Sequence, residues 1–388
     1  MTGGTAKPAL SGWPGGTTDV VGSLADVLPA AAGLLGVDLG AASTQHRSGI
    51  LPVDADDAEA VTVLLVDGLG WWPWQAHADL TPTLASMSAR QLTSTVPSTT
   101  PTALASLGTG RMPGAHGIVG AAFRLPEDDL VLHPLTWGGE PHPVAVQPER
   151  TVFESVAAAG LPVARIGASA YSDSGLTRAV LRGGEYVAAD TDDDIVDAVA
   201  VHSRGLAYAY LADLDRIGHV HGTGSREWRE CLVRVDRLVE SIIDRMPAGH
   251  HLLVTADHGM VDCMSGARVV MESLPSFDDV TIMAGEPRLR HVYVAPGKAA
   301  QVAREWSEAL EERAWVMTRE EFLASGLIGA TEPDYAGRVG DIVVLARDDT
   351  VLVSAVDPLV SGLVGQHGSI TDVEMRIPLL GAAGGGHG

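Results

Sequence analysis

The chain has 388 residues, of which 46% are apolar, and a formal net charge of −23. This length and composition exclude a disulfide-stapled mini-protein and a wholly disordered chain. The negative charge disfavours proteins that bind nucleic acid or an anionic membrane surface through basic patches. Two cysteines, Cys231 and Cys263, make neither a disulfide framework nor a CxxC metal site, and they predict a reduced, cytoplasmic setting. We expect no secretory signal and no membrane span, because no apolar run approaches about 20 residues.

Short apolar runs that stop at turn signals predict buried parallel strands. Four such runs occur, at residues 61–66, 163–167, 207–211 and 252–255. Between them lie helical segments, of which residues 225–246 are the clearest because apolar residues recur there every three or four positions. The alternation predicts an α/β fold with a mostly parallel central sheet that is flanked by helices on both faces.

Residues 284–337 have a different pattern and predict a small inserted α+β lid. A strand is expected at 290–295, a helix at 299–313, and a capping box from Thr318 to Glu321 that opens another helix. The central sheet is then expected to resume at 341–346. The predicted domains are a loose N-terminal arm (1–18), a catalytic domain (19–283 and 338–381), the lid (284–337) and a Gly-rich tail (382–388).

Acidic residues follow three of the predicted strands or their first turns. Asp67, Asp215 and Asp257 would gather at one edge of the sheet, where ligands bind in open α/β folds. A single Asp after a strand is more often a turn residue or a helix cap.

Histidines accompany these carboxylates. His219 lies one helical turn after Asp215, His258 follows Asp257 directly, and His367 stands between glycines late in the chain. Three Asp and three His form a mixed oxygen and nitrogen ligand set that suits zinc or a similar divalent cation, in a number sufficient for two ions.

A hydroxyl-rich turn at residues 97–100 leads into a helix of small residues that ends near Gly110. Alone, this segment is best interpreted as a run of N-capping Ser and Thr. Beside two metal ions, a Thr hydroxyl there can instead act as a nucleophile, because metal coordination lowers its pKa.

Five segments in this order resemble the alkaline phosphatase superfamily, and within it the type I phosphodiesterase/nucleotide pyrophosphatase family. They are LLVDGLG, PSTTPTALASLGTGRMPGAHGIVG, DLDRIGH, VTADHGM and GQHG. The resemblance implies an alkaline-phosphatase-like fold from about residue 58 onward and two divalent ions, Zn²⁺ or alternatively Mn²⁺ or Fe. It implies that Asp67, Asp257 and His258 bind the ion that activates the nucleophile. Asp215, His219 and His367 would bind the other ion, and Thr100 would be the nucleophile. Thr99 remains an alternative to it.

The implied reaction is hydrolysis of a small phosphodiester or pyrophosphate substrate through a phospho-threonine intermediate. The alternatives are a phosphomonoesterase or phosphonate hydrolase on the same scaffold, and a metal-stabilised binding protein without turnover. Arg288, Arg290 and His291 are candidates for contacting a leaving group, or else solvated charges on a strand edge, and none is assigned to the site.

Overall fold

The structure is a computed structural model that describes residues 20–40, 49–53, 58–263 and 267–384. The predicted N-terminal arm (1–18) and the last four residues of the predicted tail lie outside this part of the chain. Ala382 and Ala383, at the start of that tail, complete the last strand of the central sheet. Among the described residues, no helix combines the length and the apolar character that crossing a membrane requires.

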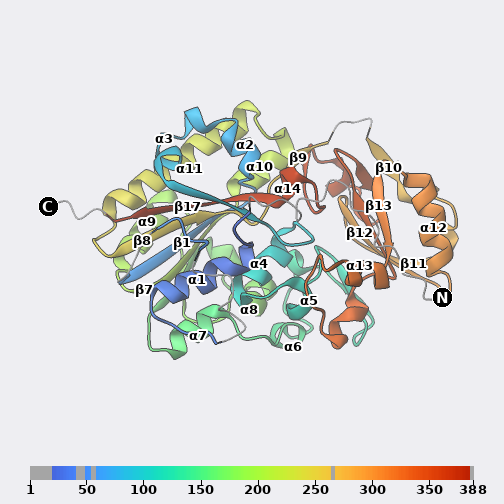
Figure 1. Ribbon diagram of the computed structural model, residues 1–388, viewed down its shortest axis with the longest axis horizontal. Coiled ribbons are helices and arrows are strands. Elements are labelled where there is room, and N and C mark those ends of the chain that lie inside the picture. Colours follow the sequence, from blue (N-terminus) through green and yellow to red (C-terminus); the bar gives the residue numbers. More distant parts are fainter. Residues whose placement is uncertain (1–19, 41–48, 54–57, 264–266, 385–388) are drawn as a thin grey trace.

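A seven-stranded sheet forms the larger part of the molecule (Figure 1). Its strand order is β2-β17-β8-β1-β7-β5-β6. The bounds are β1 Ala60–Val66, β2 Ser88–Thr93, β5 Val163–Gly167, β6 Glu185–Ala188, β7 Gly205–Leu211, β8 His250–Thr255 and β17 Arg376–Ala383. The five strands from β8 to β6 are parallel, whereas β17 is antiparallel to both β8 and β2. The four predicted strands and the mostly parallel sheet are therefore confirmed.

Helices cover both faces of this sheet, as expected for strands that are apolar throughout. Figure 1 shows α3 and α11 on one side, and α1, α7 and α8 on the other. The bounds are α1 Val27–Leu34, α2 Trp71–Gln75, α3 Pro82–Ser86, α4 Thr100–Thr109, α5 Pro113–His116, α6 Pro143–Val146, α7 Val152–Ala158, α8 Gly175–Val180, α9 Asp192–Val201, α10 Asp213–His221 and α11 Arg226–Arg245. The predicted helix at 225–246 is confirmed as α11, with Ser225 as its N-cap.

A second, four-stranded antiparallel sheet has the order β11-β12-β14-β13. Its elements are β11 Val280–Glu286, β12 Leu289–Val294, α12 Ala299–Leu310, β13 Ala314–Thr318, α13 Arg319–Ser325 and β14 Ile342–Ala346. The capping box from Thr318 to Glu321 is confirmed at the start of α13. The helix expected at 299–313 ends at Leu310, and β13 begins four residues later.

The expectation that residues 341–346 return to the central sheet is wrong. This segment is β14, which pairs with β12 and β13 in the second sheet. A continuous apolar run is typical of any strand covered on both sides, so the pattern does not say which sheet it joins. Here Val343 and Leu345 face the main core, while Ile342, Val344 and Ala346 face a separate core built with α12.

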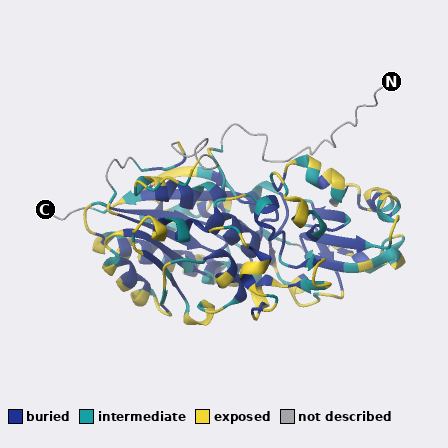
Figure 2. Cartoon of the chain, turned by 90° about the horizontal axis from the view of Figure 1, so that it is seen from below, coloured by how far each residue is buried: buried dark blue, intermediate teal, exposed yellow. Residues whose placement is uncertain are grey.

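The remaining strands are short and form three two-stranded sheets, and a short helix, α14, precedes β17. The bounds are β3 Phe123–Leu125, β4 Leu130–Leu132, β9 Val261–Asp262, β10 Arg268–Val270, β15 Val351–Val353, β16 Gly365–Gln366 and α14 Asp372–Met375. Buried residues run through the strands of both sheets (Figure 2). The domain boundaries named above remain a prediction.

Candidate metal centre and active site

The six predicted ligands lie at the carboxyl-terminal edge of the parallel strands, where open α/β sheets bind ligands. Asp67 follows β1, the pair Asp257 and His258 follows β8, and α10 carries Asp215 and His219 just after β7. His367 lies much later in the sequence, directly after β16. It is held near the other ligands because β16 pairs with β9, which follows β8. The topology thus brings together residues that are up to 300 positions apart.

These side chains form two groups that share Asp215. In one group, ligand atoms of Asp215, His219 and His367 lie within 4.8 Å of one another, and in the other those of Asp67, Asp215 and His258 do. Asp257 adjoins the second group, because its Oδ2 lies 3.4 Å from His258 Nε2. The structure therefore gathers all six predicted ligands, with Asp215 nearer to the Asp67 group than the predicted division into two sets of three implies.

Each of the three histidines is oriented by a backbone carbonyl that faces its Nδ1. His219 Nδ1 lies 2.8 Å from Gly365 O, His258 Nδ1 lies 3.1 Å from Gly259 O, and His367 Nδ1 lies 2.9 Å from Ser98 O. A carbonyl only accepts, so each Nδ1 carries the hydrogen, and Nε2 is the ring atom left to bind a cation in the cluster. The Nε2 atoms of His219 and His367 are 3.2 Å apart, a contact between two acceptors that a shared cation would stabilise.

The carboxylates fit a cation as well. Asp67 Oδ1, Asp215 Oδ1 and Asp257 Oδ2 are buried and have no hydrogen-bond partner among the described residues. Burial, reinforced by the charges of Asp257 and Asp215, raises the pKa of Asp67 well above its ordinary value. Burial also raises the pKa of Asp257. Buried carboxylates this close together, each with an oxygen that lacks a hydrogen-bond donor, are costly unless a positive charge compensates them, so the donor set fits divalent metal ions.

The two adjacent threonines occupy different positions. Thr100 is the first residue of α4, and its Oγ1 lies 3.3 Å from His258 Nε2. Thr99 is the N-cap residue, and its hydroxyl donates to Glu286 Oε2 at 3.1 Å. Only Thr100 therefore directs its hydroxyl to the ligand cluster.

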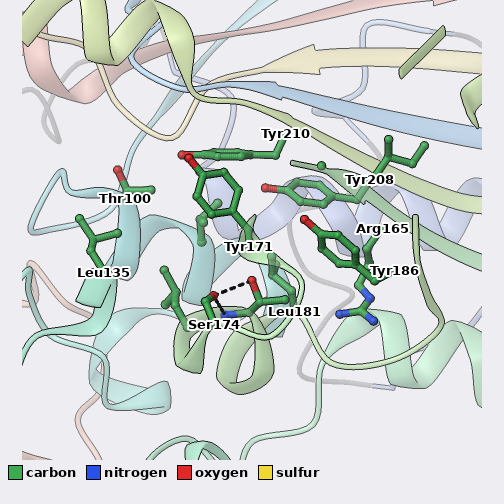
Figure 3. A pocket seen from close by; sticks show the side chains of 14 residues that line it. Thr100, Leu135, Arg165, Tyr171, Ser174, Leu181, Tyr186, Tyr208 and Tyr210 are labelled. Atoms are coloured by element: carbon green, nitrogen blue, oxygen red, sulfur yellow. Dashed lines mark hydrogen bonds between the residues drawn. The ribbon is translucent and has the colours of Figure 1, made fainter. Parts of the chain in front are cut away.

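A pocket opens beside Thr100 and encloses about 700 Å³, counting open solvent at its mouth. Figure 3 shows Thr100 at one side, four tyrosine rings across the pocket, and Arg165 at the far side. The rings are those of Tyr171, Tyr186, Tyr208 and Tyr210. The Tyr210 hydroxyl also donates a hydrogen bond to Asp67 Oδ2, so this wall of the pocket contacts a candidate metal ligand.

The three unassigned candidates on β12 and the turn before it are neither solvated nor free. Arg288 and Arg290 are fully buried and pair with Glu374 and Asp357. His291 is buried as well, with its Nε2 2.9 Å from Val119 O. The interpretation as solvated strand-edge charges is thus wrong, since each side chain has a partner in the protein interior.

Sequence reasoning missed two residues of this region, Tyr210 and Glu286. Tyr210 alternates with Tyr208 on a predicted strand that ends at the ligand edge, a pattern that could have indicated an aromatic wall. Glu286 precedes Pro287 in an expected lid, and no local signal places it beside Thr99.

Comparison with known protein sequences identifies one family whose model matches most of the chain. Residues 61–370 match the sequence model of the family described as type I phosphodiesterase / nucleotide pyrophosphatase. A phosphopentomutase of Anaeromyxobacter sp. strain K is 30% identical over 114 residues, which are 29% of this chain and only 28% of that protein.

Two similar solved structures share the fold at low sequence identity. Murine ectonucleotide pyrophosphatase/phosphodiesterase 5 has a TM-score of 0.66 and 18% identity, over 82% of this chain and 87% of its own. An inactive form of that murine protein, with a threonine replaced by alanine, was solved in complex with AMP. Phosphonoacetate hydrolase from Sinorhizobium meliloti 1021, in complex with phosphonoformate, has a TM-score of 0.65 and 17% identity, over 84% of this chain and 90% of its own.

Proposed function

Because this chain belongs to the type I phosphodiesterase/nucleotide pyrophosphatase family of the alkaline phosphatase superfamily, we propose that it hydrolyses phosphodiester or pyrophosphate bonds, with Thr100 as nucleophile. The observation that carries the proposal is a cluster of three carboxylates and three oriented imidazoles, one of which, His258, lies 3.3 Å from the hydroxyl of Thr100. A protein that only bound metal would not need a hydroxyl at this place.

Asp67, Asp257 and His258 would hold one divalent ion, and Asp215, His219 and His367 the other, with Asp215 close to both. Zn²⁺ suits this mixed ligand set best, and Mn²⁺ or Fe would also fit. When bound, such ions lower the pKa of a coordinated hydroxyl and offset the negative charge of a phosphate group.

The chain's own residues supply the remaining requirements. Thr100 Oγ1 gives up its proton and attacks phosphorus in line with the leaving oxygen; the bond to that oxygen breaks, the oxygen takes up a proton, and a phospho-threonine remains. Water then attacks this ester, its oxygen stays on phosphorus as the bond to Oγ1 breaks, and one of its protons restores the hydroxyl. At the start of α4, Pro101 has no N–H and Ala103 N donates to Thr99 O at 2.9 Å. The N–H groups available to stabilise the phosphate oxygens are therefore those of Thr100 and Thr102. The inactive threonine-to-alanine form of the murine neighbour is consistent with a threonine in this role.

The tyrosine pocket supports a diester over a monoester substrate. A monoester carries one group beyond phosphorus, whereas a diester carries two and needs space on both sides of the attacked atom. The pocket beside Thr100 provides such space, and its aromatic walls suit a flat or apolar substituent.

The first test compares hydrolysis of bis-p-nitrophenyl phosphate and p-nitrophenyl phosphate by the zinc-loaded protein. We expect the diester to be preferred. A preference for the monoester would contradict the diester assignment and favour a phosphomonoesterase, while no turnover of either with metal bound would favour a binding protein.

The nucleophile is tested by Thr100→Ala, which should lower diester turnover about 1,000-fold or more while metal content, measured by elemental analysis, stays at the wild-type level. Thr102→Ala is the matched control, since Thr102 is a buried threonine of the same helix whose hydroxyl has no partner among the described residues. Full activity of Thr100→Ala together with inactive Thr99→Ala would transfer the role to Thr99.

A further inference from the structure

The floor of the pocket beside Thr100 is one face of the central sheet. Tyr208 on β7 lies opposite Arg165 on β5, and Arg165 lies opposite Tyr186 on β6. Residues that pair across parallel strands share a face, so these three side chains form one row in the pocket (Figure 3). Gly167 follows two residues after Arg165 on the same face and brings no side chain. The floor therefore stays open between this row and the active-site edge of the sheet.

Two hydrogen-bond donors in this row have no acceptor. Tyr208 is 2% exposed, and its hydroxyl is buried without a partner among the described residues. The Nε atom of Arg165 is likewise buried and has no partner in that part of the chain. A buried donor without an acceptor costs free energy, which an acceptor would recover. Since both side chains line the pocket, a ligand can bring that acceptor.

Arg165 also lacks a counter-charge. Within the described part of the chain no carboxylate lies at ion-pair distance from it; its Nη2 donates to Gly184 O at 3.3 Å, and its guanidinium lies 5.6 Å from the centre of the Tyr186 ring. The Tyr186 hydroxyl donates to Ala168 O at 2.6 Å, which holds this ring in place. By contrast, both fully buried arginines of the β11–β12 hairpin pair with a carboxylate. An arginine stays charged at neutral pH, so Arg165 presents an uncompensated positive charge to the pocket.

The rest of the pocket, toward Thr100, is lined by aromatic and aliphatic groups. The ring centres of Tyr171 and Tyr210 lie 5.9 Å apart, with the ring planes at 71° to each other. Leu104 of α4 and Leu176 of α8 add aliphatic surface. Walls of this kind bury the ring of a ligand, while a few polar groups fix its orientation.

We propose that this pocket is a subsite for an aryl substituent of the substrate that ends in an anionic group, an inference that rests on the proposed hydrolase function. The phosphorus atom then lies at Thr100, the ring lies among the tyrosines, and the anion contacts Arg165 and Tyr208. Tyr208 and Tyr210 are two residues apart on β7, roughly 7 Å along the strand, so a single ring spans the distance from the active-site edge to the row. The chain's net charge of −23 repels an anion at long range, so the selectivity comes from this local cation.

The test uses three diesters with one leaving group: p-nitrophenyl phosphate that carries a phenyl, a 4-carbamoylphenyl or a 4-carboxyphenyl ester. The p-nitrophenol departs from each because it is the most acidic of these phenols, so only the retained substituent differs. With the zinc-loaded protein we expect kcat/KM to be about tenfold or more higher for the 4-carboxyphenyl than for the phenyl ester. The 4-carbamoylphenyl ester should lie between them, because it offers an acceptor without a charge.

Two variants assign this preference to the row. Arg165→Met should reduce the ratio of kcat/KM for the 4-carboxyphenyl to that for the phenyl ester to about threefold or less, because the charge is lost. Tyr208→Phe should bring the ratio for the 4-carbamoylphenyl ester to about one, because its hydroxyl serves a neutral acceptor. Each ratio is measured on one sample, so it does not depend on the fraction that is folded. Arg178→Met is the matched control, since Arg178 is an exposed arginine of α8 that does not line the pocket, and the wild-type ratios should persist.

The outcomes separate this subsite from the hydrolase function itself. Equal kcat/KM for the three esters in the wild type would overturn the subsite and leave the hydrolase function intact. A ratio that is unchanged in Arg165→Met, or that falls as far in Arg178→Met, would overturn it as well. If the zinc-loaded wild type cleaves none of the three esters, the proposed function fails.

Discussion

The candidate ligand histidines owe their orientation to main-chain carbonyls, in place of the carboxylates that often hold a metal-binding imidazole. A carbonyl adds no charge, which matters where several carboxylates already meet. It also makes the direction of each ring depend on the loop that supplies the carbonyl, at Gly259, Gly365 and Ser98. Substitutions that shift these loops would misdirect a ligand without removing it.

A histidine far from the active site should limit stability in acid. His250 begins β8 and is buried, with its Nε2 2.8 Å from Thr62 Oγ1. Burial, followed by the neighbouring His202 and His251, lowers the pKa of His250 from 6.5 to about 4. The fold therefore favours the neutral ring, and this contribution to stability is complete above pH 6.5 and is lost as the pH falls toward 4. His250→Gln should flatten the dependence of Tm on pH over this range.

The exposed His133 provides the control, since His133→Gln should leave the slope unchanged. An unchanged slope in His250→Gln would show that other groups cause the loss of stability in acid.

At the scale of elements, the hairpin of β11 and β12 joins the second sheet to the active-site loops. Arg288, in its turn, donates two hydrogen bonds to Glu374, at 3.0 Å and 2.8 Å, and both side chains are fully buried. Glu374 lies in α14 and also accepts a hydrogen bond from Ser369 N at 3.0 Å. Ser369 lies two residues after His367 in the sequence. The pair thus connects the hairpin that carries Glu286 to the loop that carries a candidate ligand.

Replacing only one member of this ion pair should lower the free energy of unfolding more than replacing both members. Arg288→Met leaves the Glu374 carboxylate buried without its cation and should lower the free energy of unfolding by about 3–5 kcal/mol. Arg288→Met combined with Glu374→Leu should lose less, because no uncompensated charge remains. Denaturant unfolding of both variants measures the difference, and a double variant less stable than Arg288→Met would contradict this account.

The strands of the central sheet whose residues are apolar throughout were predictable, and the two strands of that sheet that break this pattern, β2 and β17, were not. β1 was predictable because a strand that is buried on both faces needs a continuous run of apolar residues, and residues 61–66 form such a run. β2 is an edge strand with exposed side chains, and β17 contains Pro378 and Gly381, which argue against a strand interior. The ligand types and their positions were predictable from five ordered segments. The contact between Glu286 and Thr99 was not, because it depends on how the second sheet packs against the first.

At the scale of the whole molecule, folding concentrates negative charge that only bound cations can offset. The net charge is −23, and three of the carboxylates, those of Asp67, Asp215 and Asp257, lie at the candidate metal centre. Metal that binds only the folded protein stabilises it by mass action. We expect a chelator to lower Tm and added zinc to restore it. Thermal unfolding measured with and without metal tests this expectation. A Tm that changes neither with the chelator nor with added zinc would argue against a metal centre.

The position of β17 has a consequence for synthesis on the ribosome. This strand lies between β2 and β8, yet it is translated after every other strand of the sheet. Until it emerges, the nascent chain presents the unpaired edge of β8, an apolar strand buried on both faces in the finished protein. Such an edge can pair with strands of other chains. His367 lies nine residues before β17, so neither the central sheet nor the ligand set can be complete until this stretch of the chain has been translated.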